Sequence, residues 1–371
     1  MTYIHELDGW PELNWSNARI AGPLAAVSRQ QGRLLGRMEE MGFPLREEAS
    51  LAALTQEVLK SSEIEGEQLD EDQVRSSLAR RLGMDIGGLV PADRSVEGVV
   101  EMTLDATQQY EAPLTKDRLF GWHSALFPTG RSGLHKITVG GWRLDADGPM
   151  QVVSGPIGRE KVHYQAPAAD RLDEEMARFL DWFEGAQMDP LMKAGVAHLW
   201  FVTVHPFDDG NGRIARAIAD LALARADGTK QRFYSMSAEI RANRPAYYAI
   251  LERIQKGGLD ITLWLDWFFE CLGQALSSAD RILAHVLEKA RFWKSLEGQQ
   301  LNERQHRMLV RLLEGFEGKL TNAKWATLAK TSPDTALRDL RDLVDRGILV
   351  RDAAGGRSTS YSIAPDRQTK L

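Results

Sequence analysis

Hydrophobic residues recur at helical spacing through most of the chain. In the segment 46–69, Leu51, Leu54 and Val58 share one face, and Gly66 marks the end of the periodic stretch. Helical patterns follow over residues 96–106, 119–126, 170–183, 191–204, 214–226, 244–255, 262–276 and 280–296. The pattern therefore predicts a mostly α protein.

The stretch from Gly130 to Pro167 has a different texture. Glycines punctuate short β-prone runs such as Ile137-Thr138-Val139 and the residues from Met150 to Val153. Because such runs between turn residues are typical of paired strands, we expect a β-hairpin or flap here.

The last part of the chain is organised separately. Helical patterns over 303–313, 322–330 and 334–346 precede two β-prone runs on either side of Gly355-Gly356. This order predicts a winged helix-turn-helix. Since 371 residues exceed one hydrophobic core, we expect four parts: an N-terminal helical region (1–95), a core (96–280), a connecting helix (281–300) and the winged helix (301–371).

Composition narrows the class of protein. The chain is 43% hydrophobic and 26% charged, and its net charge of −6 argues against a nucleic-acid-binding polycation. Cys271 is the single cysteine, so we expect no internal disulfide, and no Cys/His cluster has metal-ligand spacing. Residues 1–11 lack the regions of a signal peptide, and 261–276 is too short and too charged to span a bilayer. We expect a cytoplasmic protein without a membrane partner.

Chemistry concentrates in the loop that starts at His205. Pro206 ends the preceding helix, and Gly210-Asn211-Gly212 leads directly into the next one, where backbone N–H groups can converge on an anion. Arg213 and Arg216 lie three residues apart and can face the same side. Together these groups suit a polyphosphate.

Two further groups of the loop suggest a reaction. Asp209 would repel phosphate alone, but it fits if it holds Mg²⁺, which binds carboxylates and phosphate oxygens together. His205 can act as a general base because its ordinary pKa is close to neutral pH. The loop therefore predicts phosphoryl or nucleotidyl transfer.

Residues 205–216 resemble the signature of the Fic family, His-Pro-Phe-x-[Asp/Glu]-Gly-Asn-Gly-Arg-x-x-Arg, at every fixed position. The resemblance extends over about residues 1–280. It implies that His205 deprotonates a Ser, Thr or Tyr hydroxyl of a target protein, or of the chain itself. The oxygen would attack the α-phosphate of ATP and release pyrophosphate. Asp209 would hold Mg²⁺, Gly210, Asn211 and Gly212 would form the anion nest, and Arg213 and Arg216 would bind the distal phosphates.

The same resemblance implies the surroundings of the ATP. Tyr247, Tyr248 and Leu251 would line the nucleoside pocket, with Gln255 where some relatives have Asn. The hairpin 140–167 would be a flap that docks the target by strand addition. Val162 and His163 would be flap residues, although His163 could equally be an ordinary hairpin residue.

A second motif lies in residues 61–66, which resemble the Fic inhibitory pattern [Ser/Thr]-x-x-x-Glu-[Gly/Asn]. Ser61 and Glu65 share one helix face, so Glu65 could reach Arg216 within the ATP site and leave ATP in an unproductive pose. Two alternatives remain open. Ser61 to Gly66 could be a simple helix end with a solvated acid, or Glu65 could position a water that removes AMP from modified targets.

The remaining partners are less constrained. The predicted recognition helix offers Arg338 and Arg341, and the wing Arg351 and Arg357, but Asp339, Asp342 and Asp345 would oppose phosphates. We therefore favour protein docking or a homodimer over DNA. Transfer of UMP or another group, removal of AMP, and an ATP-sensing transcriptional regulator stay open as alternatives.

Overall fold

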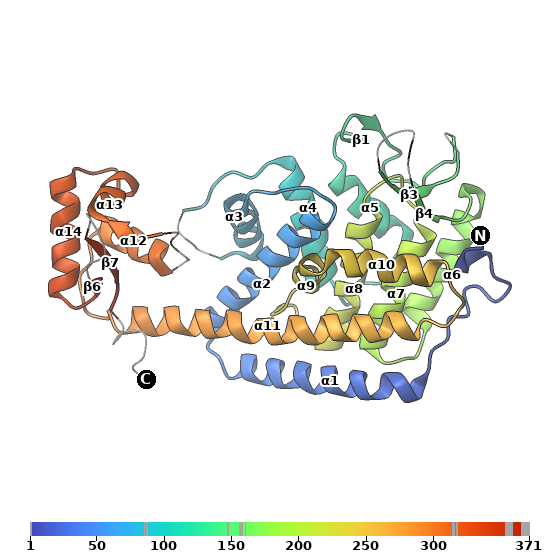
Figure 1. Ribbon diagram of the computed structural model, residues 1–371, viewed down its shortest axis with the longest axis horizontal. Helices are drawn as coiled ribbons and strands as arrows, with labels where there is room; N and C mark the ends of the chain where they lie inside the picture. The colour runs from blue at the N-terminus through green and yellow to red at the C-terminus, as the bar shows by residue number, and fades with distance from the viewer. Residues whose placement is uncertain are drawn as a thin grey trace. The chain divides into compact units, whose positions relative to one another are not determined.

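The computed structural model describes residues 2–84, 86, 88–146, 148–155, 159, 161–313, 316, 318–352 and 359–364. The chain divides into two compact units, Met1–Ile282 and Leu283–Leu371. The protein is mostly helical, as the sequence predicts (Figure 1). Among the described residues, none of the helices is both long enough and apolar enough to span a membrane.

The N-terminal part of the first unit contains the short helix η1 (Ile4–Glu6) and the helices α1 (Asn17–Glu39), α2 (Phe43–Ile64) and α3 (Glu71–Leu82). Helix α1 lies along helix α11 (Thr262–Lys294) (Figure 1). Two ion pairs at the ends of the contact, Arg19–Asp266 and Arg37–Asp280, both at 2.5 Å, fix this alignment.

Helices α7 (Pro190–Val204) and α8 (Asn211–Asp227) form the centre of the first unit. Helix α7 is buried on nearly all sides because apolar residues cover its whole circumference. The other helices of this unit are α4 (Arg94–Gln108), α5 (Lys116–Leu126), α6 (Leu172–Gly185), α9 (Met236–Ala242) and α10 (Arg244–Gln255). The short connection between α7 and α8 carries the motif loop.

The two helices expected over 262–276 and 280–296 are one continuous helix, α11. The residues between them, Ser277 to Arg281, contain neither Gly nor Pro, so nothing interrupts the backbone hydrogen bonds. The expected boundary falls where only the apolar pattern weakens.

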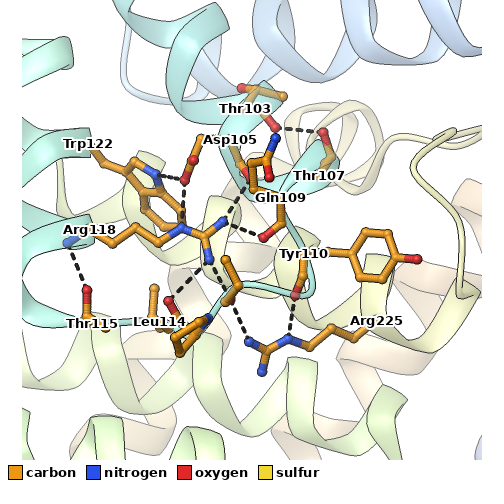
Figure 2. Close-up of polar contacts among 12 residues, drawn as sticks. Thr103, Asp105, Thr107, Gln109, Tyr110, Leu114, Thr115, Arg118, Trp122 and Arg225 are labelled. Carbon is orange, nitrogen blue, oxygen red and sulfur yellow. Dashed lines mark hydrogen bonds and ion pairs between the residues drawn. The ribbon is translucent and has the colours of Figure 1, made fainter.

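Arg118 and Arg225 organise the turn that joins α4 to α5 (Figure 2). Arg118 donates to Asp105 Oδ2 at 2.6 Å and to the carbonyl oxygens of Asp105, Gln109 and Ala112. Arg225, near the end of α8, donates to Tyr110 O at 2.8 Å. The backbone carbonyls of this turn are thus satisfied by guanidinium groups.

The segment expected to form a hairpin contains two. Strands β1 (Arg131–Ser132) and β2 (His135–Lys136) pair with each other, and β3 (Gln151–Ser154) pairs antiparallel with β4 (Lys161–Gln165). Gln151 lies opposite Gln165, and Ser154 lies opposite Lys161. Gly158, one of the punctuating glycines, lies outside the described residues. We call the β3–β4 hairpin the flap.

The second unit contains α12 (Glu303–Leu313), α13 (Asn322–Leu328) and α14 (Pro333–Asp345). Strands β5 (Leu320–Thr321), β6 (Leu349–Arg351) and β7 (Ser360–Ile363) form an antiparallel sheet in the order β5-β7-β6. Its core is built around Trp325, Leu309 and Leu340. The winged helix stays a prediction, and the turn Gly355-Gly356 and the wing residue Arg357 lie outside the described residues.

One acid of the predicted recognition helix does not face outward. Asp339 is 5% exposed and accepts from Arg304 Nε at 2.9 Å and Asn302 Nδ2 at 3.0 Å. The expectation that Asp339 would repel phosphates is therefore wrong, because its charge is paired inside the unit. Arg338 and Arg341 are exposed on the same helix.

Candidate active site

His205 follows the last residue of α7 and has a left-handed backbone, with φ 52° and ψ 57°. A non-glycine residue rarely adopts this conformation unless its surroundings hold it there. Its Nδ1 lies 3.2 Å from Val202 O. Because a carbonyl only accepts, Nδ1 carries the proton and Nε2 keeps a free lone pair.

Burial, reinforced by the nearby charge of Arg143, lowers the pKa of His205 to about 4. The imidazole is thus neutral near pH 7, as a general base must be.

The loop after His205 is closed by Asn211. Asn211 Oδ1 accepts from Phe207 N at 3.0 Å, and Asn211 Nδ2 donates to Phe207 O at 2.7 Å. Phe207 is buried and stacks on His123 with ring centroids 4.2 Å apart. The Asn211 side chain therefore shapes the loop, and any role in the anion nest falls to its backbone.

Gly210 makes the sharp entry into α8 possible. It has φ 80°, and a Cβ added here would lie 2.9 Å from the Phe127 ring. Only glycine accommodates both the left-handed backbone and this contact. The backbone N–H groups at the start of α8, which have no acceptor within the helix, consequently lie next to His205.

Asp209 is the acid that the sequence singles out for a metal. Its Oδ1 accepts from Gly210 N at 2.5 Å, and its Oδ2 accepts from Ser132 Oγ of the β1–β2 hairpin. Each carboxylate oxygen keeps a further lone pair, the kind of ligand that Mg²⁺ takes. Among the described residues, no three His, Cys, Asp or Glu side chains gather around a common metal position. The residues present therefore fit a Mg²⁺ held by Asp209 together with phosphate oxygens of a substrate.

Helix α2 ends in a turn that points two acids at the start of α8. Glu67 N donates to Ser62 O at 3.0 Å, and Gly66 N donates to Glu63 O at 3.1 Å. With Gly66 at φ 89°, this is the Schellman arrangement that glycine allows at a helix C-terminus. The turn fixes the positions of Glu65 and Glu67, one on each side of Gly66.

Arg216 is held by Ser61 and Glu65. Its Nη2 lies 2.8 Å from Glu65 Oε1, its Nε donates to Ser61 Oγ at 2.9 Å, and its Nη2 also donates to Ser61 O. Glu65 Oε1 also occupies the space beside Gly212, where an added Cβ would approach it to 2.2 Å. The carboxylate thus lies at the N-terminal turn of α8, in the place that suits a phosphate group.

Arg213 is also paired with an acid, Glu67, which is not part of either motif. Its Nη1 lies 2.7 Å from Glu67 Oε2, and its guanidinium stacks over the Phe127 ring. Both arginine side chains are buried (3% and 2% exposed), whereas those of Glu65 and Glu67 are 28% and 47% exposed. Within the described part of the chain, Arg213 Nε and Arg216 Nη1 have no hydrogen-bond partner. Each arginine thus has one buried nitrogen that no group of the described chain satisfies.

A cavity of about 760 Å³ lies between the flap, the motif loop and α10. Tyr247, Tyr248, Leu251 and Gln255 line it, together with His205, Glu65 and Gly212. Tyr247 is buried by His198, whose Nε2 is 2.9 Å from the Tyr247 hydroxyl, and by Trp267. Gln255 Nε2 lies 3.4 Å from Thr203 Oγ1. All four residues expected to surround a nucleoside border this one space.

The flap covers this cavity through His163. His163 Nδ1 lies 2.7 Å from Glu252 Oε2 on α10, and its Nε2 lies 2.6 Å from Ser154 Oγ on β3. Val162 is 37% exposed. The two residues named for the flap thus differ, since His163 lines the cavity and Val162 is not among its described lining residues.

Comparisons with known proteins agree with this geometry. Residues 113–223 match the model of the Fic/DOC family, and residues 3–84 match a domain of unknown function, DUF4172. This protein contains a Fic domain. The Fic domain spans the region from the end of the α4–α5 connection to α8, and so includes the flap and the complete motif loop.

The names of two curated relatives of this chain refer to the transfer of different groups. It is 27% identical over 235 residues to the protein adenylyltransferase Fic of Culex quinquefasciatus, covering 62% of this chain and 42% of that one. It is 32% identical over 122 residues to a uridine 5'-monophosphate transferase of Xanthomonas campestris, covering 31% and 22%. The chain thus spans less than half the length of these curated relatives.

A solved structure extends the likeness of fold beyond the domain. A Fic family protein of Desulfovibrio desulfuricans matches with a TM-score of 0.55 and 21% identity, covering 96% of this chain and 99% of that one. At this identity the match speaks for the fold.

Proposed function

We propose that this protein transfers AMP from ATP to a hydroxyl of a protein and that the turn after α2 restrains this activity. The observation that carries the proposal is the meeting of a neutral His205, the open start of α8 and two buried arginines beside one cavity. Relatives named protein adenylyltransferases support the choice of ATP.

In the reaction, His205 Nε2 takes the proton of the attacking hydroxyl. The hydroxyl oxygen forms a bond to the α-phosphorus, and the bond to the β-phosphate oxygen breaks, so that pyrophosphate leaves. Arg213 and Arg216 stabilise the charge of the distal phosphates. Mg²⁺, held by Asp209, would neutralise charge on the phosphate oxygens. The target's backbone would pair with an open edge of the flap.

The restraint follows from the contacts of Glu65. Its carboxylate lines the cavity, while the described lining residues do not include Arg216 behind it. A γ-phosphate would have to displace this carboxylate to reach Arg216. ATP bound without that contact would present its α-phosphate away from in-line attack, and a misplacement of about 1 Å can lower the rate on the order of 10²-fold.

The experiment is to incubate the unmodified protein, Glu65→Gly and Glu65→Gly/His205→Ala with α-labelled ATP and Mg²⁺ and to follow label on protein. We expect strong labelling of Glu65→Gly, weak labelling of the unmodified protein and none of Glu65→Gly/His205→Ala. Labelling that survives the loss of His205 would refute its role as the base.

A parallel incubation with α-labelled UTP tests the second candidate, transfer of UMP, which the relative in Xanthomonas supports. Preferential labelling from UTP would replace ATP as the donor and leave the roles of His205 and Glu65 in place. For the second unit we keep the earlier proposal of protein docking or dimerisation.

A further inference from the structure

Arg143 is a buried arginine at the base of the flap, and the motif does not include it. It is 1% exposed, and its guanidinium has three sets of partners. Nε donates to His205 O at 2.8 Å, Nη1 lies 2.6 Å from Asp145 Oδ1, and Nη2 donates to Pro167 O at 2.5 Å. Each of the three guanidinium nitrogens therefore binds a group of the protein.

The backbone of Arg143 adds a fourth contact to the motif loop. Its N–H donates to Pro206 O at 2.9 Å. The carbonyl groups of His205 and Pro206 are thus both bound by one residue that lies 62 positions earlier than His205. These two carbonyls follow the left-handed backbone of His205, which needs external support to persist.

The other partners of Arg143 belong to the two feet of the flap. Asp145 lies before β3, and its second oxygen accepts from Ala169 N at 2.6 Å. Pro167 lies after β4, next to Ala166, whose N–H donates to Met150 O. Arg143 consequently joins the start and the end of the flap to the loop that carries the base.

We propose that Arg143 is a positioning residue that fixes His205 relative to the flap, so that a hydroxyl docked on the flap meets Nε2. This rests on the proposed function, because it assigns His205 as the base and the flap as the docking strand. Lysine cannot replace the arginine, since a single ammonium cannot hold carbonyls on two sides and a carboxylate in one plane.

Arg118 provides a matched control (Figure 2). It is also a mostly buried arginine that binds one carboxylate and several backbone carbonyls. Its guanidinium donates to Ala112 O, as does that of Arg225, and Arg225 lies about 20 Å along α8 from Asn211. Replacing Arg118 by lysine removes the same kind of contacts away from the site.

The test compares Arg143→Lys with Arg118→Lys, each in the Glu65→Gly protein. We expect Arg143→Lys to lower kcat by about 10–100-fold and to leave the KM for ATP within about threefold, because Arg143 holds the base rather than the nucleotide. Arg118→Lys should leave kcat within about twofold. Thermal melting of both proteins reports any common loss of stability. Equal effects of the two substitutions on kcat would overturn the proposal.

A second readout needs no substrate. In ¹⁵N-histidine-labelled protein at pH 7.5, the nitrogen shifts of His205, assigned from His205→Ala, report which nitrogen carries the proton. We expect one tautomer protonated on Nδ1 in the parent and in Arg118→Lys, and a mixture in Arg143→Lys. If Glu65→Gly transfers no AMP, the proposed function has failed and this spectrum alone decides whether Arg143 positions His205. An unchanged tautomer would refute it.

Discussion

The motif loop and the turn after α2 meet at the same two arginines, but they are built differently. In the loop, Asn211 satisfies both backbone groups of Phe207, and Arg143 binds the carbonyls of His205 and Pro206. In the turn, Glu65 and Glu67 each hold one arginine through an ion pair whose acid is partly in solvent.

This difference distinguishes the loop, which is held by buried hydrogen bonds, from the carboxylates of Glu65 and Glu67, which another anion can displace. Buried hydrogen bonds are costly to break because the groups left behind have no water to replace the lost partner. A partly exposed ion pair is exchanged at low cost, since water solvates the released carboxylate. Under the proposed function, the loop is the fixed part of the site, and the Glu65 carboxylate is the anion that a phosphate group would replace.

The largest effect on stability is expected from the loop. Asn211→Ala leaves the buried N–H and C=O of Phe207 without partners, so we expect the free energy of unfolding to fall by about 2–4 kcal/mol. Transfer by Glu65→Gly/Asn211→Ala should become undetectable because the loop loses its shape. Urea unfolding measures the loss. Asn17→Ala, which removes an exposed contact with Trp15, is the control and should change stability by less than about 0.5 kcal/mol.

A loss from Asn211→Ala no larger than that from Asn17→Ala would contradict the contrast between the two regions. It would mean that the loop keeps its conformation without the Asn211 bridge.

The next effect concerns pH. At pH 5.5 a base with an ordinary pKa of about 6.5 would be only about one-tenth neutral, whereas His205, with a pKa of about 4, stays almost entirely neutral. We therefore expect Glu65→Gly to keep most of its transfer rate from pH 7.5 to 5.5, measured under saturating ATP. A tenfold fall over this range, with circular dichroism unchanged, would show that His205 is not shielded as described.

Three buried histidines, His205 among them, set the sensitivity of the fold to acid. Burial lowers the pKa of His123 and His205 to about 4, and that of His198 to about 3. Unfolding returns each to about 6.5, so the unfolded state binds more protons as pH falls below that value. The stability that these neutral side chains contribute is present above pH 6.5 and is lost as pH falls toward 4. Denaturation midpoints should decline over this window.

The comparison also explains what the sequence could and could not predict. The helices, the hairpin region and the motif were predictable because they depend on local periodicity and on a signature within twelve residues. Ser61 and Glu65 were named because they too lie in a short motif. The contact of Glu65 with Arg216 followed from placing the two motifs in one site.

Contacts between distant segments left no such signal. Glu67 meets Arg213 across 146 positions, and Arg143 meets His205 across 62. The position of Glu67 had a local clue, since the residue after a left-handed Gly66 turns back over the helix end. Asp339 looked like a surface acid because helical spacing alone does not show that Arg304 lies beside it.

A smaller effect is expected at Glu67. Because its carboxylate is almost half exposed, its pair with Arg213 should contribute about 0.2–1 kcal/mol. Glu65→Gly/Glu67→Gln should therefore bind ATP about two- to fivefold more tightly than Glu65→Gly, measured by calorimetry. Glu71→Gln, at an exposed acid in the first turn of α3, is the control for the lost negative charge. Equal gains from both substitutions would mean that net charge, and not the Glu67–Arg213 pair, limits ATP binding.

The smallest effect should come from the exposed ion pairs on α2. Lys60 and Arg241 lie 2.6 Å and 3.3 Å from the Glu63 carboxylate, but the helix is anchored by buried Glu57, which accepts from Ser235 Oγ at 2.7 Å and Ser237 N at 3.1 Å. We expect Lys60→Ala to change the free energy of unfolding by at most about 0.5 kcal/mol. The ratio of the transfer rate of Glu65→Gly to that of the protein with Glu65 should be the same with Lys60 and with Lys60→Ala. If Lys60→Ala raised transfer in the protein that keeps Glu65, the ion pairs of Glu63 would control the position of Glu65. Salt, which weakens exposed ion pairs, would then also raise transfer.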